Sequence, residues 1–392
     1  MEERYRWNIL ALIYLSMLAF AFVFQSIPPV LSLIIHDFQI SHTQAGLLMT
    51  LFALPGIFLS IPGGILFDLF GTKKIAVSCF VLMIVGVLVV IFGRTFLHLA
   101  IGRTVSGVGA LVLAIGLPRF LIQWFSGKEL GIAMGIFNTA IPLGSIISFS
   151  LLGRLGKGLG WHTSVSLSGI VTFIALIAFL LFFKHPPSLN NASLREFNFQ
   201  LPNFRETGIS IWLLAMAWMW FNASLISLST FAPDFFMEHR GFSIGFAGFL
   251  TSFIMWGSLL FSPAVGYIID KWGFKEILIA ISGLILGVVI FLIPYVPGFL
   301  IFFMVLIGLS VALVPAPVFS LPSDLLEPEN LGFGFGIIST CLSVGMVFGP
   351  YFVGLIREQT GSYEMSFIAM AGFALFVTIT ILSLFFITPS KR

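Results

Sequence analysis

Residues 64–73 read GILFDLFGTK, and residues 266–275 read GYIIDKWGFK. Both stretches fit the pattern G-x-x-x-D-x-x-G-x-K, and they lie 202 residues apart in the chain. Each follows one long apolar run and precedes another, so the pattern marks the same loop in two copies of one membrane unit. Two such units fused in tandem predict two halves around a shared central path, which is the architecture of a transporter.

The composition of the chain indicates that its solvent is a bilayer. Its 392 residues are 58% hydrophobic and 9% charged, with a mean hydropathy of +1.09, whereas soluble domains carry about 25% charged residues. A spanning helix needs about 20 apolar residues. Twelve apolar stretches suit this role, near residues 7–35, 43–67, 74–93, 96–125, 129–154, 162–183, 208–236, 243–269, 276–294, 297–325, 331–356 and 364–388. We therefore predict an all-α integral membrane protein with twelve transmembrane helices in two pseudo-symmetric halves of six.

The most polar long gap divides these stretches six and six. We predict an N-terminal bundle over 1–183, a cytoplasmic linker over 184–207 and a C-terminal bundle over 208–392. The distribution of Lys and Arg sets the orientation. With the N-terminus inside, twelve of the 19 basic residues fall on the cytoplasmic side and five fall on the outer side. Both termini are therefore predicted to be cytoplasmic, in the inner or plasma membrane.

Three motifs resemble those of the major facilitator superfamily, a family of secondary transporters. They are the loop motif at 64–73, the pattern Arg103-x-x-Ser106-Gly107-x-Gly109-Ala110, and Gly345-x-x-x-Gly349-Pro350 followed by Thr360-Gly361-Ser362-Tyr363. With the twelve spans and the repeat, the chain is identified as a member over essentially its whole length. The resemblance implies transport of a small solute by alternating access. Leu69 and Thr72 depart from the loop motif, which usually carries basic residues there, and Pro142-Leu143-Gly144 only partly matches the antiporter pattern.

The resemblance extends to bacterial porters of small anions such as cyanate and nitrate. Nitrate porters of this family carry arginines in the second and eighth spans, and this chain has none there, so nitrate is not predicted. The family also assigns a gating role to the loop motif, in which Asp68 latches the two halves together on the cytoplasmic side. The alternative is a topogenic loop in which Asp68 caps a helix. The gating residues implied in both copies are Gly64, Asp68, Gly71, Lys73, Gly266, Asp270, Gly273 and Lys275.

Three charges fall within predicted spans, where an ionised side chain is expensive and marks a functional site by default. Arg103 is expected to bond backbone carbonyls or polar side chains of neighbouring helices, either as a structural hub or in coupling. Arg119 follows Pro118 and would favour an anionic substrate if it faces the cavity. Alternatively, it extends to the membrane surface or pairs with an acid. Asp234 is a candidate proton carrier if it is buried, and the alternative is that the seventh span ends earlier and leaves it in water.

Polar and aromatic residues of the first and seventh spans are the candidates for lining a substrate cavity. Tyr14, Ala21 and Gln25 share one helix face at spacings of seven and four, and Ala21 would leave space between the two polar tips. Trp218, Asn222 and Ser229 form a similar stripe. The alternative is that such residues only pack or contact lipid. The full set of cavity candidates is Tyr14, Gln25, Arg119, Asn138, Thr139, Trp218, Asn222, Ser229 and Thr340.

The glycine pairs Gly131-x-x-x-Gly135 and Gly332-x-x-x-Gly336 predict close helix packing at the wall of this cavity. Small residues at this spacing let the backbones of two helices approach each other. We expect both pairs to contact a neighbouring helix.

The sequence contains no pattern that indicates nucleotide hydrolysis or metal binding. The phosphate-binding pattern G-x-x-x-x-G-K-[ST] is absent, and the six histidines lie near helix ends without metal-ligand spacing. We therefore expect no enzyme activity, no cofactor, no metal and no nucleic-acid partner. The expected partners are a small-molecule substrate, the lipid bilayer and, as coupling ion, protons. We expect a monomer that carries a small organic or inorganic anion. An exporter of apolar compounds and a non-transporting sensor on a transporter scaffold stay as alternatives.

Overall fold

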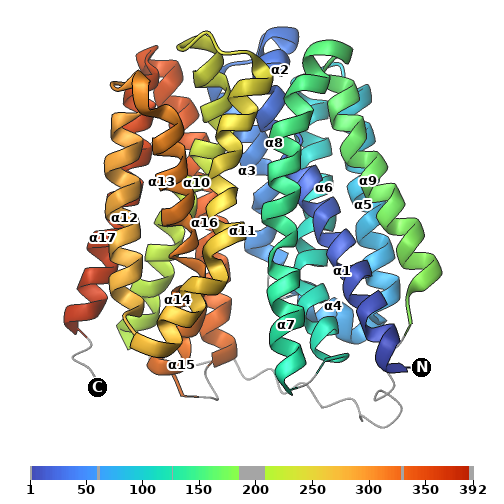
Figure 1. The fold of residues 1–392 in the computed structure, drawn as a ribbon. Coiled ribbons are helices and arrows are strands. Elements are labelled where there is room, and N and C mark those ends of the chain that lie inside the picture. Colours follow the sequence, from blue (N-terminus) through green and yellow to red (C-terminus); the bar gives the residue numbers. More distant parts are fainter. Residues whose placement is uncertain (1, 60–61, 126, 185–207, 328–330, 388–392) are drawn as a thin grey trace.

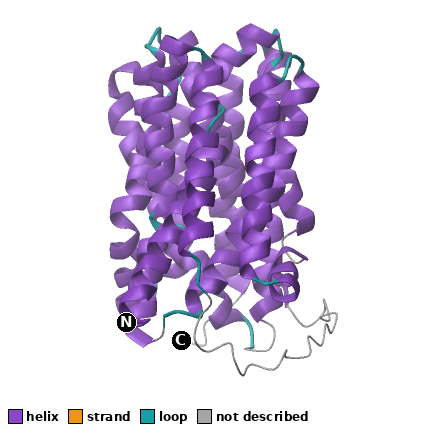
Figure 2. Cartoon of the chain, turned by 90° about the vertical axis from the view of Figure 1, so that its right-hand side faces the viewer, coloured by secondary structure: helices purple, strands orange, loops and turns teal. Residues whose placement is uncertain are grey.

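The computed structural model describes residues 2–59, 62–125, 127–184, 208–327 and 331–387. Within these ranges the chain is almost entirely helical and contains no strand (Figure 2). Twelve helical segments are long and apolar enough to cross a membrane, which confirms the predicted number. The first helix begins and the last helix ends at the same end of the molecule (Figure 1). We call this the terminal end, and the opposite end the distal end.

The first half consists of six spans, the first and fifth of which are composite. Its helices are α1 (Glu2–Phe24) continued by η1 (Pro28–Val30) and α2 (Leu31–Phe38), then α3 (His42–Leu59), α4 (Pro62–Phe70), α5 (Thr72–Phe92), α6 (Phe96–Ile122), α7 (Gly127–Asn138) continued by α8 (Ala140–Leu159), and α9 (Trp161–Phe182). The short α4 lies beyond α3, and residues 60 and 61 between the two are outside the described residues. It follows α3 on the way to α5, toward the terminal end (Figure 1).

The second half also has six spans, and its fourth span is broken twice. Its helices are α10 (Gly208–Glu238), α11 (Ile244–Trp272), α12 (Lys275–Leu292), η3 (Pro297–Phe299), α13 (Leu300–Ala312) with α14 (Pro315–Ser320) and α15 (Pro322–Leu325), α16 (Leu331–Thr360), and α17 (Tyr363–Ile387). The predicted linker lies outside the described residues, apart from Lys184.

Prolines fall at several helix boundaries because a proline lacks the backbone N–H that would continue a helix. Pro28 begins η1, Pro315 begins α14 and Pro322 begins α15. The second predicted span, 43–67, is covered by α3, whose described part ends at Leu59, and by α4, whose described part begins at Pro62; residues 60 and 61 lie outside the described residues. Elsewhere, Pro55 and Pro233 lie inside continuous helices.

The two halves meet mainly through two helix pairs, α3 with α16 and α8 with α11, and α10 adds smaller contacts to η1, α2 and α3. The two main pairs are the second span with the eleventh and the fifth with the eighth. Exchanging equivalent spans of the two halves turns one pair into the other, so the interface follows the internal repeat. The seventh span, α10, runs through the interior, and its residues 221–236 are all buried.

Candidate functional site

The pairing of α3 with α16 brings the two halves into backbone contact toward the distal end. A side chain at Gly46 would overlap the backbone carbonyl of Pro350, and a side chain at Gly354 would overlap that of His42. The hydroxyl of Thr50 donates a 2.6 Å hydrogen bond to the carbonyl oxygen of Val347. Only residues without side chains allow helices to approach this closely, so these glycines permit a tight seal.

The second helix pair makes a matching contact. A side chain at Gly248 of α11 would overlap the backbone carbonyl of Phe149 in α8. A Cβ added at Gly153 of α8 would lie 3.1 Å from the carbonyl oxygen of Ile244, the first residue of α11. Both contacts lie toward the distal ends of their helices. The distal end is therefore closed by backbone-to-backbone packing on both pairs.

Glycines nearer the terminal end of the same membrane spans have open space beside them. Gly135 in α7, Gly266 in α11 and Gly336 in α16 have no described atom within 4 Å of the position that a Cβ would take. Gly131 is in the same situation. The expectation that Gly131, Gly135 and Gly336 pack closely against a neighbouring helix is therefore wrong in this conformation, because no neighbouring helix reaches these positions. The surroundings of Gly332 lie outside the described part of the structure.

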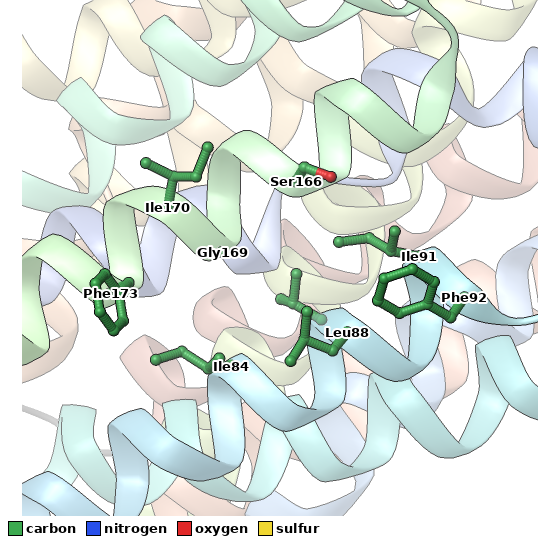
Figure 3. A pocket seen from close by; sticks show the side chains of 9 residues that line it. Ile84, Leu88, Ile91, Phe92, Ser166, Gly169, Ile170 and Phe173 are labelled. Atoms are coloured by element: carbon green, nitrogen blue, oxygen red, sulfur yellow. The ribbon is translucent and has the colours of Figure 1, made fainter.

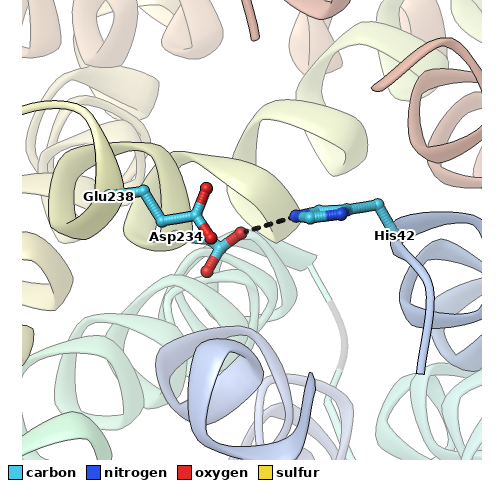
Figure 4. A group of neighbouring side chains, drawn as sticks. All are labelled: His42, Asp234 and Glu238. Carbon is cyan, nitrogen blue, oxygen red and sulfur yellow. Dashed lines mark ion pairs between the residues drawn. The ribbon is translucent and has the colours of Figure 1, made fainter. Parts of the chain in front are cut away.

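An ionisable cluster joins the two halves at the closed distal end (Figure 4). The imidazole Nε2 of His42, at the start of α3, lies 3.4 Å from a carboxylate oxygen of Asp234 in α10. Glu238 lies one helical turn further along α10, and its carboxylate lies beside that of Asp234. One ligand atom of each of these three residues lies within 4.8 Å of the other two.

Asp234 is buried, with only 1% of its surface exposed. The alternative in which the seventh span ends earlier and leaves Asp234 in water is wrong, because α10 continues to Glu238. Tyr363 of α17 donates a hydrogen bond to Asp234 Oδ2. The other oxygen, Oδ1, is buried without a hydrogen-bond partner among the described residues.

A further cation borders this cluster. Arg357 of α16 lies 3.3 Å from a carboxylate oxygen of Glu238, and its guanidinium stacks over the ring of Tyr363 at 4.3 Å. His239 packs edge-on against the same ring. Glu358 accepts a hydrogen bond from the backbone N–H of Thr43, which adds a second polar link between α16 and α3.

Arg103 forms a hydrogen-bond hub inside the first half. Its guanidinium donates to the backbone carbonyls of Val23, Phe24 and Leu48 at 2.8–3.2 Å. It also lies over the ring of Phe52, with 4.4 Å to the ring centre. The side chain is 2% exposed. These contacts tie α6 to α3 and to the residues where α1 ends, and they are of the kind that the sequence analysis expects.

Two predicted cavity residues come together near the junction of α7 and α8. The hydroxyls of Tyr14 and Thr139 lie 3.2 Å apart, within hydrogen-bond distance. Ala21 does not leave the expected space between polar tips, because it is fully buried against Gly144 of α8. Asn138 is exposed, next to Thr139.

Two of the three predicted cavity residues on α10, Asn222 and Ser229, form hydrogen bonds to backbone carbonyls of their own helix, whereas the indole N–H of Trp218 has no partner among the described residues. Asn222 donates to the carbonyl of Trp218, and Ser229 donates to that of Leu225. Thr340 of α16 likewise donates to the carbonyl of Gly336. Trp218 packs against Phe221 and, edge-on, against Phe319 of α14, with ring centres 5.3 and 5.7 Å apart.

Besides Asp234 Oδ1, four buried polar atoms, one directly after α1, two on α8 and one on α10, lack a hydrogen-bond partner among the described residues. They are Gln25 Oε1, Ser145 Oγ, Ser148 Oγ and Trp218 Nε1. A buried polar atom left unpaired costs about 1–3 kcal/mol. Native structures therefore pair nearly all such atoms with protein, water or a ligand. Gln25 and Trp218 belong to the predicted set, whereas Ser145 and Ser148 were missed because serine is common in ordinary helix packing.

The repeated loop motif is only partly described. Gly71 and Gly273, its second glycines, have φ angles of 81° and 80°, a region that favours glycine. The surroundings of Gly64 and the side chains of Asp68 and Asp270 lie outside the described part of the structure. Lys275 pairs with Asp324 at 2.5 Å within the second half. Of the other predicted residues, Lys73 is partly buried and Arg119 is exposed.

A separate apolar groove of about 300 Å³ lies between α5 and α9 (Figure 3). Its lining includes the exposed side chains of Leu88, Phe92, Ile170 and Phe173. It lies within the first half, away from the helix pairs that join the halves. Exposed apolar side chains of this kind suit contact with lipid chains.

Sequence reasoning missed the partners of Asp234. His42 was interpreted as a residue near a helix end, Tyr363 only as part of the turn after the eleventh span, and Glu238 was not a candidate. The spacing of four between Asp234 and Glu238 places both acids on one helix face, and this signal was available. The approach of His42 was not, because it comes from the other half of the chain.

Comparison with known proteins agrees with this architecture. The family model described as "Major Facilitator Superfamily" matches residues 13–246 and 213–392. The chain is 24% identical over 369 residues to the human lysosomal dipeptide transporter MFSD1, covering 86% of this chain and 77% of that protein. It is 24% identical to the hexuronate transporter of Bacillus subtilis, covering 88% and 86%. It is 23% identical to the nitrite extrusion protein of the same organism, covering 93% and 91%.

The fold also matches solved structures. The crystal structure of the nucleoside transporter NupG superimposes with a TM-score of 0.81 at 14% sequence identity, covering 96% of this chain and all of that one. At this identity the likeness shows the fold alone. The family and the curated relatives are transporters, not enzymes, in agreement with the prediction.

Proposed function

The chain belongs to the major facilitator superfamily, and from this premise we propose that it carries a small anionic solute by alternating access. The contrast between glycines at the two ends carries the proposal. Gly46, Gly248 and Gly354 are in backbone contact across the halves, whereas Gly135, Gly266 and Gly336 have open space beside them. Rocking the halves about their centre would reverse this contrast and expose a central site to the distal side.

The substrate class is a small organic or inorganic anion. The relatives support this choice, because hexuronate and nitrite are anions and a dipeptide carries a carboxylate. In the chain itself, Trp218 Nε1 is a buried donor without a partner, and donors of this kind suit an anion's oxygens. Arg119, in the last turn of α6, adds positive charge toward the terminal end.

Thermal unfolding of the detergent-purified protein with a panel of solutes tests the substrate class. The panel compares small carboxylates and inorganic anions with neutral solutes and lipophilic cations. A solute that binds only the folded state at a hundredfold excess over its dissociation constant stabilises it by about 2.7 kcal/mol. We expect stabilisation by an anion and a weaker affinity in Arg119→Ala.

Trp218→Phe sharpens this test, because it keeps an aromatic ring and removes only the N–H donor. Losing one hydrogen bond of about 1 kcal/mol should weaken anion affinity about fivefold. Trp212→Phe, at an exposed position on the same helix, is the matched control and should bind like the parent protein. Stabilisation only by apolar compounds, unchanged in Arg119→Ala, would point to an exporter of apolar compounds instead.

Flux into liposomes separates a transporter from a sensor, because a sensor binds its ligand without moving it. The predicted coupling to protons is measured in the same assay. With EDTA on both sides, an imposed pH gradient should drive accumulation of the anion. Flux that ignores the gradient would refute proton coupling and leave transport itself intact.

We place the protein in the plasma membrane as a monomer, with the terminal end in the cytoplasm. The excess of basic residues on that side supports the orientation. In this placement the closed end faces outward, and the open end faces the cytoplasm.

A further inference from the structure

We propose that His42, Asp234 and Glu238 form a binding site for a divalent transition-metal ion at the distal junction of the two halves. The three residues come from both halves, since α3 supplies the imidazole and α10 supplies the two carboxylates. Histidine nitrogen and carboxylate oxygen are both zinc ligands, and zinc sites that keep an open position for water use three protein ligands.

The spacing of the donor atoms suits such an ion. One ligand atom from each residue lies within 4.8 Å of the other two. The 3.4 Å between His42 Nε2 and Asp234 Oδ2 matches the edge of about 3.4 Å in a tetrahedron whose metal–ligand bonds are about 2.1 Å. Moving the Glu238 carboxylate inward would complete three protein ligands.

Unpartnered atoms give an independent reason to place a ligand here. Asp234 is 1% exposed, yet its Oδ1 has no hydrogen-bond partner among the described residues. His42 Nε2 is also buried without a hydrogen bond. A bound cation would be a partner for these atoms, since Asp234 Oδ1 makes no hydrogen bond to the described residues and His42 Nε2 has only the 3.4 Å ion pair with Asp234 Oδ2.

The charges also favour a cation. Two carboxylates this close repel each other when both are ionised, and the only fixed positive charge in contact with them, among the described residues, is Arg357 on Glu238. A carboxylate has two oxygens, so Glu238 can keep Arg357 on one and offer the other to the metal. The side chain of Glu238 is 42% exposed, which provides an entry from the distal side.

The donor set selects among metals. Calcium and magnesium prefer oxygen ligands alone, whereas imidazole with carboxylates suits zinc and its neighbours in the first transition row. Zinc is therefore the probe of choice. The metal site does not depend on the solute that the protein carries, but its consequence rests on alternating access. An ion bound by residues of both halves would hold the distal end closed.

Thermal unfolding with zinc chloride, without any transported solute, tests the site. We expect zinc to raise the melting temperature of the parent protein by several degrees and EDTA to reverse the rise. His42→Ala, Asp234→Asn and Glu238→Gln should each weaken zinc affinity at least tenfold. His36→Ala and Glu364→Gln replace exposed residues of the same types at the distal end and should bind zinc like the parent.

Asp234→Asn puts an amide in a buried network, and this variant could fail to fold. Glu238→Gln and His42→Ala change more exposed side chains, so these two variants still test the site if Asp234→Asn does not fold. Equal stabilisation of all variants by zinc would assign the binding to other surface groups and overturn the site. No stabilisation of the parent protein would overturn it as well. Because EDTA is present in the flux assay, failure of the metal site and failure of transport are distinguished.

A second readout tests the locking of the halves. Spin labels on Lys157→Cys in α8 and Glu364→Cys in α17, both exposed positions near the distal end, report the separation of the halves after Cys79 and Cys341 are replaced by alanine. Zinc should narrow the distribution of distances between the two labels and shift it to the shorter distances of the closed distal end. His42→Ala should abolish this effect. Zinc binding without narrowing would overturn the locking role.

Discussion

Arg103 illustrates how one side chain can organise the first half. A guanidinium presents five N–H donors in a rigid fork, and here three bonds go to backbone carbonyls from the end of α1 and from α3. The carbonyls of Val23 and Phe24 lie at the C-terminal end of α1, where intrahelical partners run out, whereas that of Leu48 lies inside α3. The geometry favours the structural hub over the coupling role among the alternatives that the sequence leaves open.

Replacing Arg103 by alanine should therefore destabilise the protein. The substitution removes three hydrogen bonds from a charged donor to buried carbonyls, and bonds to charged groups contribute about 1.5–3 kcal/mol each, so we expect a loss of at least about 2 kcal/mol, measured as a lower melting temperature in detergent. Arg103→Lys keeps the charge but loses the fork, and it should recover only part of the stability. An unchanged melting temperature with abolished transport would instead assign Arg103 to coupling.

Asp234 marks the limit of sequence reasoning at this scale. Its position after Pro233 near the end of an apolar run is compatible with a buried acid and with a solvated one. Burial follows from packing, because α10 is enclosed by neighbouring helices over residues 221–236 and Tyr363 covers the carboxylate. The neighbours that decide its environment are distant in sequence.

At the scale of helices, the pairing of α3 with α16 depends on the absence of side chains at a few positions. Gly46→Ala would insert a Cβ into the carbonyl of Pro350. Because the contact exists only when the distal end is closed, we expect the substitution to shift the equilibrium toward an open distal end. The labels at positions 157 and 364 should then report longer distances.

Gly135→Leu provides the opposite change. The space beside Gly135 is open in this structure, so a larger side chain is accepted here and obstructs closure of the terminal end. The labels should report the closed distal state even more uniformly. Gly372→Ala, where a Cβ also meets open space but on α17, is the control and should leave the distances unchanged.

Helix breaks show what local sequence can and cannot define. The prolines at 28, 315 and 322 start new helical segments, as their missing N–H requires. Pro55 and Pro233, in contrast, are accommodated within continuous helices. Neighbouring helices in a bundle can satisfy the freed backbone groups, so the outcome at a given proline depends on packing.

The orientation of the whole molecule can be tested by cysteine labelling in cells. We expect Lys157→Cys, near the distal end, to react with a membrane-impermeant maleimide added outside, after Cys79 and Cys341 are replaced by alanine. Lys74→Cys, at the start of α5 toward the terminal end, should react only after the membrane is permeabilised. The reverse labelling pattern would contradict the predicted cytoplasmic termini.

The sequence by itself determined the class of fold, the number of spans, the duplication and the membership of a transporter family. These follow from composition, apolar run length and local motifs, because a bilayer imposes the same requirement on every span. Only the tertiary structure decided which end is closed, where the halves touch and how His42 of one half meets Asp234 and Glu238 of the other. Those features arise from contacts between residues far apart in the chain, and alternating access requires such contacts to form and break while the helices themselves persist.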